Sequence, residues 1–212
     1  MTSTMRIDRI EASRHKKGRV LVFLEDGACL KITEQELLDF GLRSGDQLSA
    51  AQMKRLREAA GLSDTKATAA DLIGKRAMSR AGLERKLREK GASEAEARYA
   101  GEWLEAIGAL NDADYAALLV RHYGQMGYGP RYVQEKLREK GVPRELWEDA
   151  LEALPEAAEQ IDRFLASKLR GRDPDPREKK RLTDALVRRG YNLGDVKSGW
   201  SRYGAELSED EP

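Results

Sequence analysis

The segment Lys86-Leu87-Arg88-Glu89-Lys90-Gly91 recurs unchanged as Lys136-Leu137-Arg138-Glu139-Lys140-Gly141. A weaker echo, Leu186-Val187-Arg188-Arg189-Gly190, follows at nearly the same spacing. Internal repetition with a period of about 50 residues indicates that one structural unit occurs three times. Such units stack on their neighbours and expose a long surface, which favours a binding role over catalysis.

The chain has 212 residues, of which 38 are basic and 37 acidic, so its formal net charge is +1. This near-neutrality argues against a protein that simply coats nucleic acid, because such proteins are usually strongly basic. The single cysteine, Cys29, excludes an internal disulfide and cysteine-cluster zinc sites, and we expect it to be buried in a strand. No apolar run has the length of a signal peptide or membrane span, so we expect a cytoplasmic protein.

Strand patterns occupy the beginning of the chain. The apolar runs Arg19–Leu24 and Ala28–Ile32 flank the pair Asp26-Gly27, which favours a two-residue type I′ hairpin. Met5–Ile10 alternates with period two and predicts a third strand. Residues 1–66 are therefore expected to form a small α+β domain with a β-hairpin.

Two capping-box patterns predict the helices of this domain. One begins at Thr33 and predicts a helix that stops at Gly41; the other begins at Ser49 and predicts a helix that ends before Gly61. We interpret residues 62–70 as a linker or helix lead-in.

From residue 71 onward the chain reads as helices in groups of three. Gly91, Gly141 and Gly190 follow the second helix of each group, where a residue that tolerates positive φ ends a helix well. The predicted helices are Asp71–Met78, Arg80–Lys90 and Glu94–Ile107; Asp112–Gln125, Pro130–Lys140 and Pro143–Ala153; and Ala157–Arg170, Pro176–Arg189 and Leu193–Tyr203.

The prediction is thus a mainly α protein in which three tandem three-helix repeats form an elongated, curved array after the α+β domain. The repeats are expected at residues 67–110, 111–154 and 155–204. Residues 205–212 are expected to form an acidic, frayed tail.

The second helix of each repeat is rich in Lys and Arg, including Arg177, Lys179, Lys180 and Arg181 in the third. If stacking aligns these helices, a basic stripe could meet phosphates or an acidic protein surface. The plainer interpretation is a solvated face, because cations near a helix C-terminus stabilise the macrodipole. The candidate partner- or DNA-binding residues are Arg80, Arg85, Lys86, Arg88, Lys90, Tyr128, Arg131, Lys136, Arg138, Lys140, Arg188 and Arg189.

No pattern indicates catalysis. His15 and His122 are the only histidines, and neither has a nucleophilic partner or metal-ligand spacing. His122 is expected to be packed or half exposed. Neither a Walker loop nor a Gly-x-Gly-x-x-Gly motif occurs. We therefore expect a protein that is not an enzyme and has no catalytic residues, no metal and no cofactor.

The most specific local segment is Gly127-Tyr128-Gly129-Pro130-Arg131. Its structural interpretation is a tight link between two helices, with Tyr128 as a plug. Its functional interpretation is an exposed aromatic ring that stacks on a base or fills a partner pocket. We assign a structural role to the glycines and Pro130 and leave Tyr128 open.

Taken together, these residues resemble the RecX family of bacterial recombinase regulators over about residues 71–203. The N-terminal Arg6–Ala60 is similar to the β-containing extension of longer members. One departure is Tyr123–Met126, where relatives are often basic. The stretches that carry the resemblance are Ser79–Gly91, Asn111–Tyr115, Gly127–Val142 and Arg188–Tyr191.

The resemblance implies tandem three-helix units, a non-catalytic role and no cofactor. It implies binding to the RecA recombinase filament on single-stranded DNA, insertion into the filament groove and restraint of strand exchange. Family members also bind DNA directly, so single- or double-stranded DNA is a second expected partner. We expect a monomer that makes no membrane contact.

Three hypotheses remain open at this stage. The first is a modulator that binds a recombinase filament. The second is a sequence-nonspecific DNA-binding module that competes for single strands. The third, an enzyme with an unrecognised site, has no motif in its support.

The tandem arrangement predicts an elongated particle. A compact globule of this length would have a radius of gyration of roughly 17 Å. We expect small-angle X-ray scattering to give a clearly larger value, because stacked repeats contact only their neighbours. A radius near that of the compact globule would contradict the tandem array.

Overall fold

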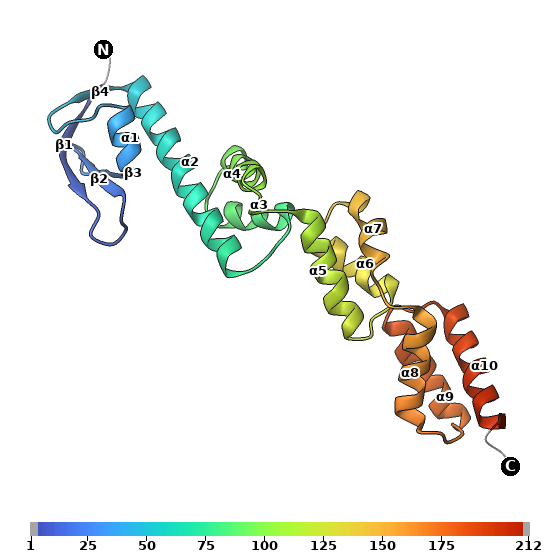
Figure 1. The fold of residues 1–212 in the computed structure, drawn as a ribbon. Coiled ribbons are helices and arrows are strands. Elements are labelled where there is room, and N and C mark those ends of the chain that lie inside the picture. Colours follow the sequence, from blue (N-terminus) through green and yellow to red (C-terminus); the bar gives the residue numbers. More distant parts are fainter. Residues whose placement is uncertain (1–3, 210–212) are drawn as a thin grey trace. The chain divides into compact units, whose positions relative to one another are not determined.

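The computed structural model describes residues 4–209, with side chains through residue 204. The chain forms two compact units (Figure 1). The first contains the residues up to Ala77 together with Gly82–Leu110; the second contains Met78–Ala81 and the residues from Asn111 onward. The predicted fold class is confirmed: the protein is mainly α, with a small antiparallel sheet near its N-terminus.

The sheet has four antiparallel strands in the order β3-β2-β1-β4. The three longer strands were predicted, whereas β4 is too short for an alternating pattern to reveal it. The strands are β1 (Thr4–Ala12), β2 (Arg19–Leu24), β3 (Cys29–Thr33) and β4 (Gln47–Ser49).

The turn between β2 and β3 differs from the predicted type I′ turn. That turn needs positive φ at both central residues, but of Asp26 and Gly27 only Gly27, at φ +83°, has one. The Gly27 amide donates to the Leu24 carbonyl at 2.9 Å, and the Leu24 amide donates to the Ala28 carbonyl at 2.8 Å. The loop therefore has three residues and a left-handed glycine at its end.

Helices α1 (Glu34–Asp39) and α2 (Ala50–Lys75) begin at the predicted capping boxes. However, α2 does not end before Gly61, so residues 62–70 are not a linker and Asp71–Met78 is not a separate helix. Gly61 lies inside α2, where a Cβ would lie 2.2 Å from the carboxylate end of the Glu96 side chain on the neighbouring helix. The domain boundary predicted at residues 66 and 67 falls within the continuous helix α2. This boundary stays a prediction.

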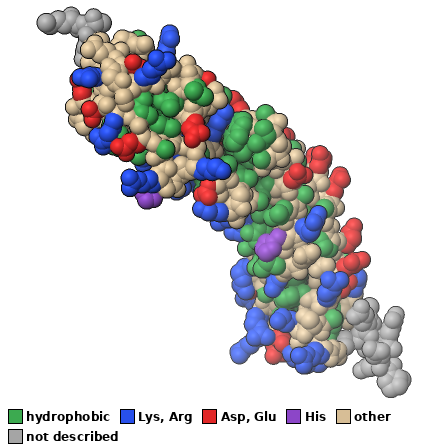
Figure 2. Space-filling model, turned by 60° about the vertical axis from the view of Figure 1, so that its left-hand side comes forward, with side chains coloured by type: hydrophobic (Ala, Val, Ile, Leu, Met, Phe, Trp, Pro, Cys, Tyr) green, Lys and Arg blue, Asp and Glu red, His purple; other side chains and the backbone are tan. Residues whose placement is uncertain are grey.

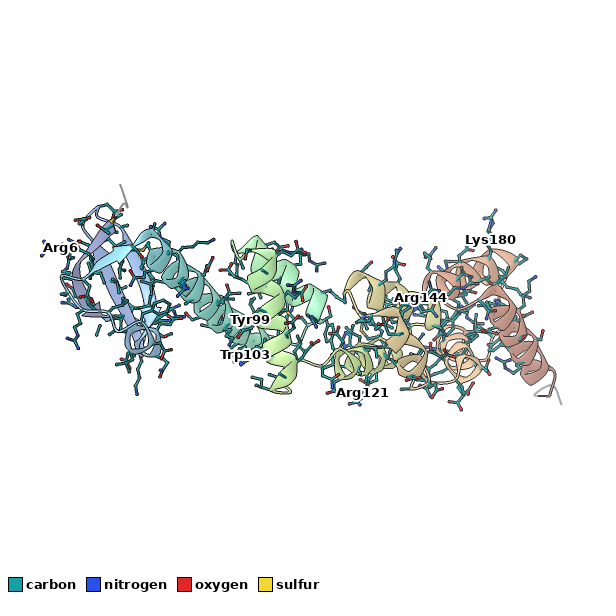
Figure 3. The ribbon with its side chains drawn as sticks, turned by 90° about the horizontal axis from the view of Figure 1, so that it is seen from above. Arg6, Tyr99, Trp103, Arg121, Arg144 and Lys180 are labelled. Carbon is teal, nitrogen blue, oxygen red and sulfur yellow. The ribbon has the colours of Figure 1, made fainter. Side chains whose placement is uncertain are left out.

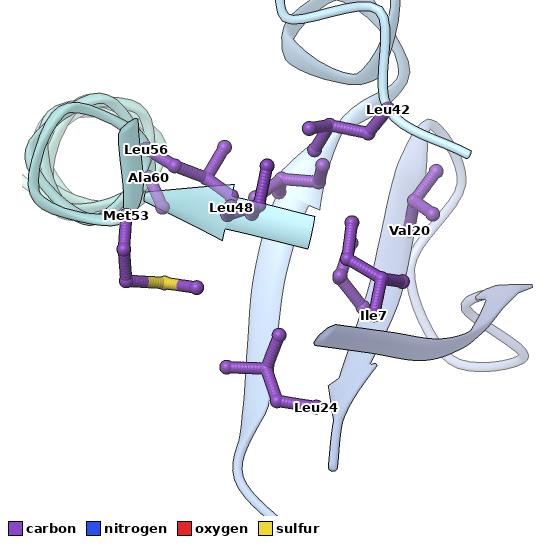
Figure 4. Packing of buried hydrophobic residues seen from close by; sticks show 10 residues of the cluster. Ile7, Val20, Leu24, Leu42, Leu48, Met53, Leu56 and Ala60 are labelled. Carbon is purple, nitrogen blue, oxygen red and sulfur yellow. The ribbon is translucent and has the colours of Figure 1, made fainter. Parts of the chain in front are cut away.

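The sheet and α2 share one apolar core (Figure 4). Ile7, Val22 and Ile32 from the strands and Leu56 from α2 are fully buried. Leu48 of β4 joins the same cluster. This core fixes the hairpin of β1 and β2 to the N-terminal half of α2.

Most of the remaining helices match their predicted ranges within a residue or two. One exception is the segment predicted as a single helix over Pro143–Ala153, which begins as a 3₁₀ turn. The other is α10, which continues to Glu209, so residues 205–209 are helical rather than frayed; residues 210–212 lie outside the described range. The helices are α3 (Arg80–Glu89), α4 (Glu94–Ala106), α5 (Asp112–Gln125), α6 (Pro130–Glu139), η1 (Arg144–Leu146), α7 (Trp147–Leu151), α8 (Ala157–Leu169), α9 (Pro176–Arg188) and α10 (Leu193–Glu209).

The second unit contains two three-helix groups, each with its own core. Val133 and Leu137 of α6 pack with residues of α5 and α7. Leu182 and Leu186 of α9 pack with residues of α8 and α10. These i, i+4 pairs are 5% exposed or less, so one stripe of each second helix is buried and the opposite side faces solvent.

The two groups meet where the C-terminal end of α9 contacts the N-terminal end of α6. The Gly129 amide donates to the Arg189 carbonyl at 2.7 Å, and the Arg131 amide donates to the Gly190 carbonyl at 3.2 Å. The first amides of a helix have no partner within the helix, and Gly129 has no side chain to cap α6. Backbone carbonyls of the next group therefore take the place of an N-cap side chain.

A related contact lies at the start of α3. Ser79 is fully buried, and its hydroxyl donates to the carbonyl of Lys140 at the end of α6. The Arg80 amide donates to Asp112 Oδ1 at 2.7 Å. These two bonds join the start of α3 to the end of α6 and to the start of α5.

Substituting Gly190 with Ala tests the close approach between α9 and α6. Gly190 has φ +94°, and a Cβ would lie 2.3 Å from the Tyr132 amide nitrogen. We expect a loss of about 3 kcal/mol or more in the free energy of unfolding, because positive φ and overpacking both oppose a side chain. Urea unfolding followed by circular dichroism measures this loss.

Gly91→Ala is the matched control. Gly91 has φ +98°, but a Cβ there would have nothing within 4 Å. We expect this variant to lose only about 1 to 2 kcal/mol. Equal losses in the two variants would show that the close contact does not matter.

Candidate functional site

The solvent-facing side of α6 carries part of the predicted binding set. Arg131 and Arg138 are exposed, and Lys136 and Lys140 are half-buried. The opposite side of the helix is the buried Val133–Leu137 stripe. The amphipathic pattern therefore determines which way these cations point.

Two of the α6 cations pair with glutamates of the same helix. Arg138 Nη2 lies 2.5 Å from Glu135 Oε1, and Lys136 Nζ lies 2.7 Å from Glu139 Oε2. The hydrogen bond to each glutamate raises the pKa of Lys136 and of Arg138, and the bond from Lys136 lowers the pKa of Glu139. Ion pairs between neighbouring residues on a helix surface contribute little to stability. The solvated-face interpretation therefore fits these two residues well.

Arg131 is different. Its side chain is exposed at the start of α6, and within the described residues it forms no ion pair. A free guanidinium can offer two parallel hydrogen bonds to a carboxylate or phosphate. Among the α6 cations, Arg131 is the one best placed to contact an external anion.

Helix α9 carries the larger concentration of charge. On the face drawn in Figure 2, Lys and Arg side chains gather on the part nearest the C-terminus. Lys180 points outward from its helix in Figure 3. A shallow hollow on this helix contains four cations and one carboxylate; it is lined by Arg177, Lys180, Arg181, Asp184 and Arg188.

Arg188 of this hollow is in the predicted binding set, whereas Arg177, Lys180 and Arg181 are not. Their positions explain the grouping, because residues three, four and seven or eight apart lie on one face of a helix. Helical spacing was therefore the signal that could have found them. Arg181 also approaches Glu178 at 3.4 Å, whereas Arg188 is exposed at the end of the helix.

Arg189, which was in the predicted set, makes internal contacts. Its Nη1 atom donates to the carbonyl of Met126 at 3.1 Å and to that of Gly127 at 3.3 Å. Its guanidinium also lies 5.5 Å from the centre of the Tyr128 ring. Arg189 thus holds the link before α6 against the end of α9.

Tyr128 is half-buried within an aromatic cluster. Its ring stacks on Tyr132 with centroids 4.0 Å apart, and Tyr123 meets both rings edge-on. Partial burial raises the pKa of the Tyr132 hydroxyl, while nearby Lys136 acts to lower it. This packing favours the plug interpretation of Tyr128. Gly127, at φ +75°, and Pro130, at the first position of α6, have the predicted structural roles.

The α3 positions belong mainly to the first unit. Arg85, Arg88 and Lys90 are exposed, and Arg80 and Lys86 are half-buried. Arg88 and Lys86 lie in the last turn of α3, where cations stabilise the helix macrodipole. The exposure pattern of α3 resembles that of α6.

The described residues contain no cluster of His, Cys, Asp and Glu suited to a metal ion. His122 is exposed and touches Tyr123 edge-on, with ring centroids 5.0 Å apart. Cys29 is exposed, so its predicted burial is wrong: it lies at the start of edge strand β3, next to the turn. None of the described helices combines the length and apolar character needed to cross a bilayer.

Comparison with solved structures finds the same fold. A crystal structure of a regulatory protein RecX superposes with a TM-score of 0.69 and 24% identity, covering 92% of this chain and 99% of the other. The crystal structure of RecX from Lactobacillus salivarius gives a TM-score of 0.62 and 22% identity, covering 69% and 99%.

Comparison of sequences gives more specific matches. Residues 111–151 match the family model described as RecX, second three-helix domain. The regulatory protein RecX of Pseudomonas entomophila is 31% identical over 141 residues, which are 64% of this chain and 91% of that protein. The regulatory protein RecX of Trichlorobacter lovleyi is 35% identical over 136 residues, covering 61% and 88%. The chain therefore belongs to the RecX family of regulatory proteins.

Proposed function

We propose that this protein binds a RecA-type recombinase filament on single-stranded DNA and restrains its activity. Membership of a family of regulatory proteins supports this role. The observation that carries the proposal is the contact between the end of α9 and the start of α6. This contact holds two basic helices in series within one compact unit.

The physical reasoning starts from the symmetry of the partner. A helical filament presents the same protomer surface at regular intervals. A chain with equivalent helices at regular intervals can place similar side chains against successive protomers. Because Arg131 and Arg188 are exposed, we infer that they face acidic groups of the filament.

The proposed action is non-catalytic and requires no cofactor. Binding energy alone would restrain the filament, by occupying its surface or opposing the motions needed for strand exchange. A single chain supplies the whole surface, so we propose that a monomer acts.

A second candidate function is direct, sequence-nonspecific binding to single-stranded DNA. The α9 hollow favours it, because four cations around one carboxylate leave a local excess of positive charge. In this alternative the protein would compete with the recombinase for the strand. Both functions use the same helices and differ in their partner.

Charge reversal on the second helices tests the proposal. We expect Arg85→Glu, Arg88→Glu, Arg131→Glu and Arg138→Glu together to weaken inhibition of recombinase ATPase and strand exchange at least about tenfold, since like charges would face the filament. Circular dichroism should show unchanged helix content, because all four side chains are exposed.

A matched control reverses four exposed cations that lie off the second helices, namely Arg121, Arg144, Arg163 and Lys197. This variant has the same net charge as the test variant and should inhibit like the wild type. If the folded test variant retained inhibition, or if both variants lost it equally, the second helices would not be the binding surface.

Salt dependence separates the two candidate functions. Binding through phosphates should weaken steeply with salt, with a log–log slope of roughly −0.7 for each neutralised phosphate on single strands. We expect capture of the recombinase filament to persist at moderate salt while binding to bare DNA is lost. Inhibition that disappeared in parallel with DNA binding would favour competition for the strand.

A further inference from the structure

The loop between β1 and β2 carries four consecutive basic or imidazole side chains: Arg14, His15, Lys16 and Lys17. All four are exposed. No acidic residue occurs between Glu11 and Glu25. In a chain with nearly equal numbers of acidic and basic residues, this is a local excess of positive charge outside the helical repeats.

Hydrogen bonds define the shape of this loop. The Ser13 amide donates to the Arg19 carbonyl at 2.8 Å, and the Arg19 amide donates to the Lys16 carbonyl at 3.3 Å. The Ser13 hydroxyl accepts from the His15 and Lys16 amides at 3.4 and 3.3 Å. The backbone thus closes on itself, and the four side chains are left to point into solvent.

Arg19, which follows the loop directly, differs from the four loop side chains because it has partners within the protein. Its guanidinium donates to the hydroxyl and the carbonyl of Ser63 on α2, both at 3.1 Å, and lies 3.4 Å from Asp64. Only 10% of its side chain is exposed. Arg19 therefore fixes the base of the hairpin to α2, whereas within the described residues Arg14, Lys16 and Lys17 form no ion pair.

We propose that this loop binds the phosphate backbone of nucleic acid and gives the N-terminal domain a role of its own. The loop lies at the end of the β1–β2 hairpin opposite to the end that pairs with β4 (Figure 1). A two-stranded β-ribbon fits the major groove of a duplex, and lysines act as point charges toward phosphates on any strand. The required chemistry is a row of phosphates, from a single strand or a duplex.

A phosphate partner accounts for this loop better than a protein partner does. Protein interfaces are depleted in lysine and centre on buried aromatic or apolar anchors, and the tip offers only Arg, His and Lys side chains beside Ser13 and Gly18. Phosphate recognition needs no apolar anchor and is independent of sequence. The loop has the charge and exposure for that mode.

The test uses the full-length chain with Arg14→Ala, Lys16→Ala and Lys17→Ala together. Fluorescence anisotropy with labelled single-stranded and duplex oligonucleotides of the same sequence measures binding at several salt concentrations. We expect binding at low salt to weaken at least about tenfold, and the log–log salt slope to fall in magnitude by about 2 to 3, as the loss of three phosphate contacts implies. The oligonucleotide that responds more identifies the preferred strand form.

The control variant removes three exposed cations from α2 of the same unit, Lys54→Ala, Arg55→Ala and Arg57→Ala. It should bind like the wild type, and thermal unfolding should show that both variants fold. The proposal is overturned by wild-type affinity in the loop variant, by equal losses in both variants, or by a wild-type chain that binds neither oligonucleotide at low salt. Loss of recombinase capture with unchanged oligonucleotide binding would overturn it in favour of a protein partner.

Discussion

The second unit depends on a close approach between two backbones, where the Gly190 carbonyl meets the Arg131 amide and the Arg189 carbonyl meets the Gly129 amide. Neither glycine could carry a side chain here. A Cβ on Gly129 would lie 2.8 Å from the Gly190 carbonyl group, and one on Gly190 would lie 2.3 Å from the Tyr132 nitrogen. The contact also places the negative end of the α9 dipole against the positive end of the α6 dipole. Bonds between backbones leave the outer side chains of both helices free for other partners.

The basic side chains fall into two groups: some have partners within the protein, and others are exposed to solvent. Arg189 donates hydrogen bonds to backbone carbonyls in the link before α6, and Arg19 donates hydrogen bonds to Ser63 of α2. Lys136 and Arg138 are balanced by glutamates on their own helix. The side chains that remain, such as Arg131, Arg188 and the loop cations after β1, are exposed. A near-neutral protein can therefore present local positive charge without an excess over the whole chain.

Features that depend on a few neighbouring residues were predictable from the sequence. The capping boxes at Thr33 and Ser49, the proline at the start of α6 and the glycines after the second helices occur as expected. Features that depend on distant residues were not. Gly61 resembles a helix stop until Glu96 is seen against it, and Asp26-Gly27 resembles a two-residue turn until the strand register is known.

In the candidate site, too, local sequence predicted some residues, and others depend on contacts with distant residues. Helical spacing was enough to place Arg131, Arg138 and Arg188 on exposed faces, and it could also have grouped Arg177, Lys180 and Arg181. The internal role of Arg189 could not be predicted, because its partners, the Met126 and Gly127 carbonyls, are more than 60 residues away in sequence. Tyr128 remained open for the same reason, since an aromatic residue after a glycine fits either a plug or an exposed ring.

Amide hydrogen exchange at the start of α6 tests the central claim most directly. The second amide of a helix normally exchanges quickly, because it has no acceptor within the helix. If the α9–α6 contact holds the two helices in series, the Arg131 amide should be strongly protected, while the equivalent amide of α9, Arg177, should exchange freely. Equally fast exchange at Arg131 and Arg177 would contradict the account, because the second helices would then not be held together.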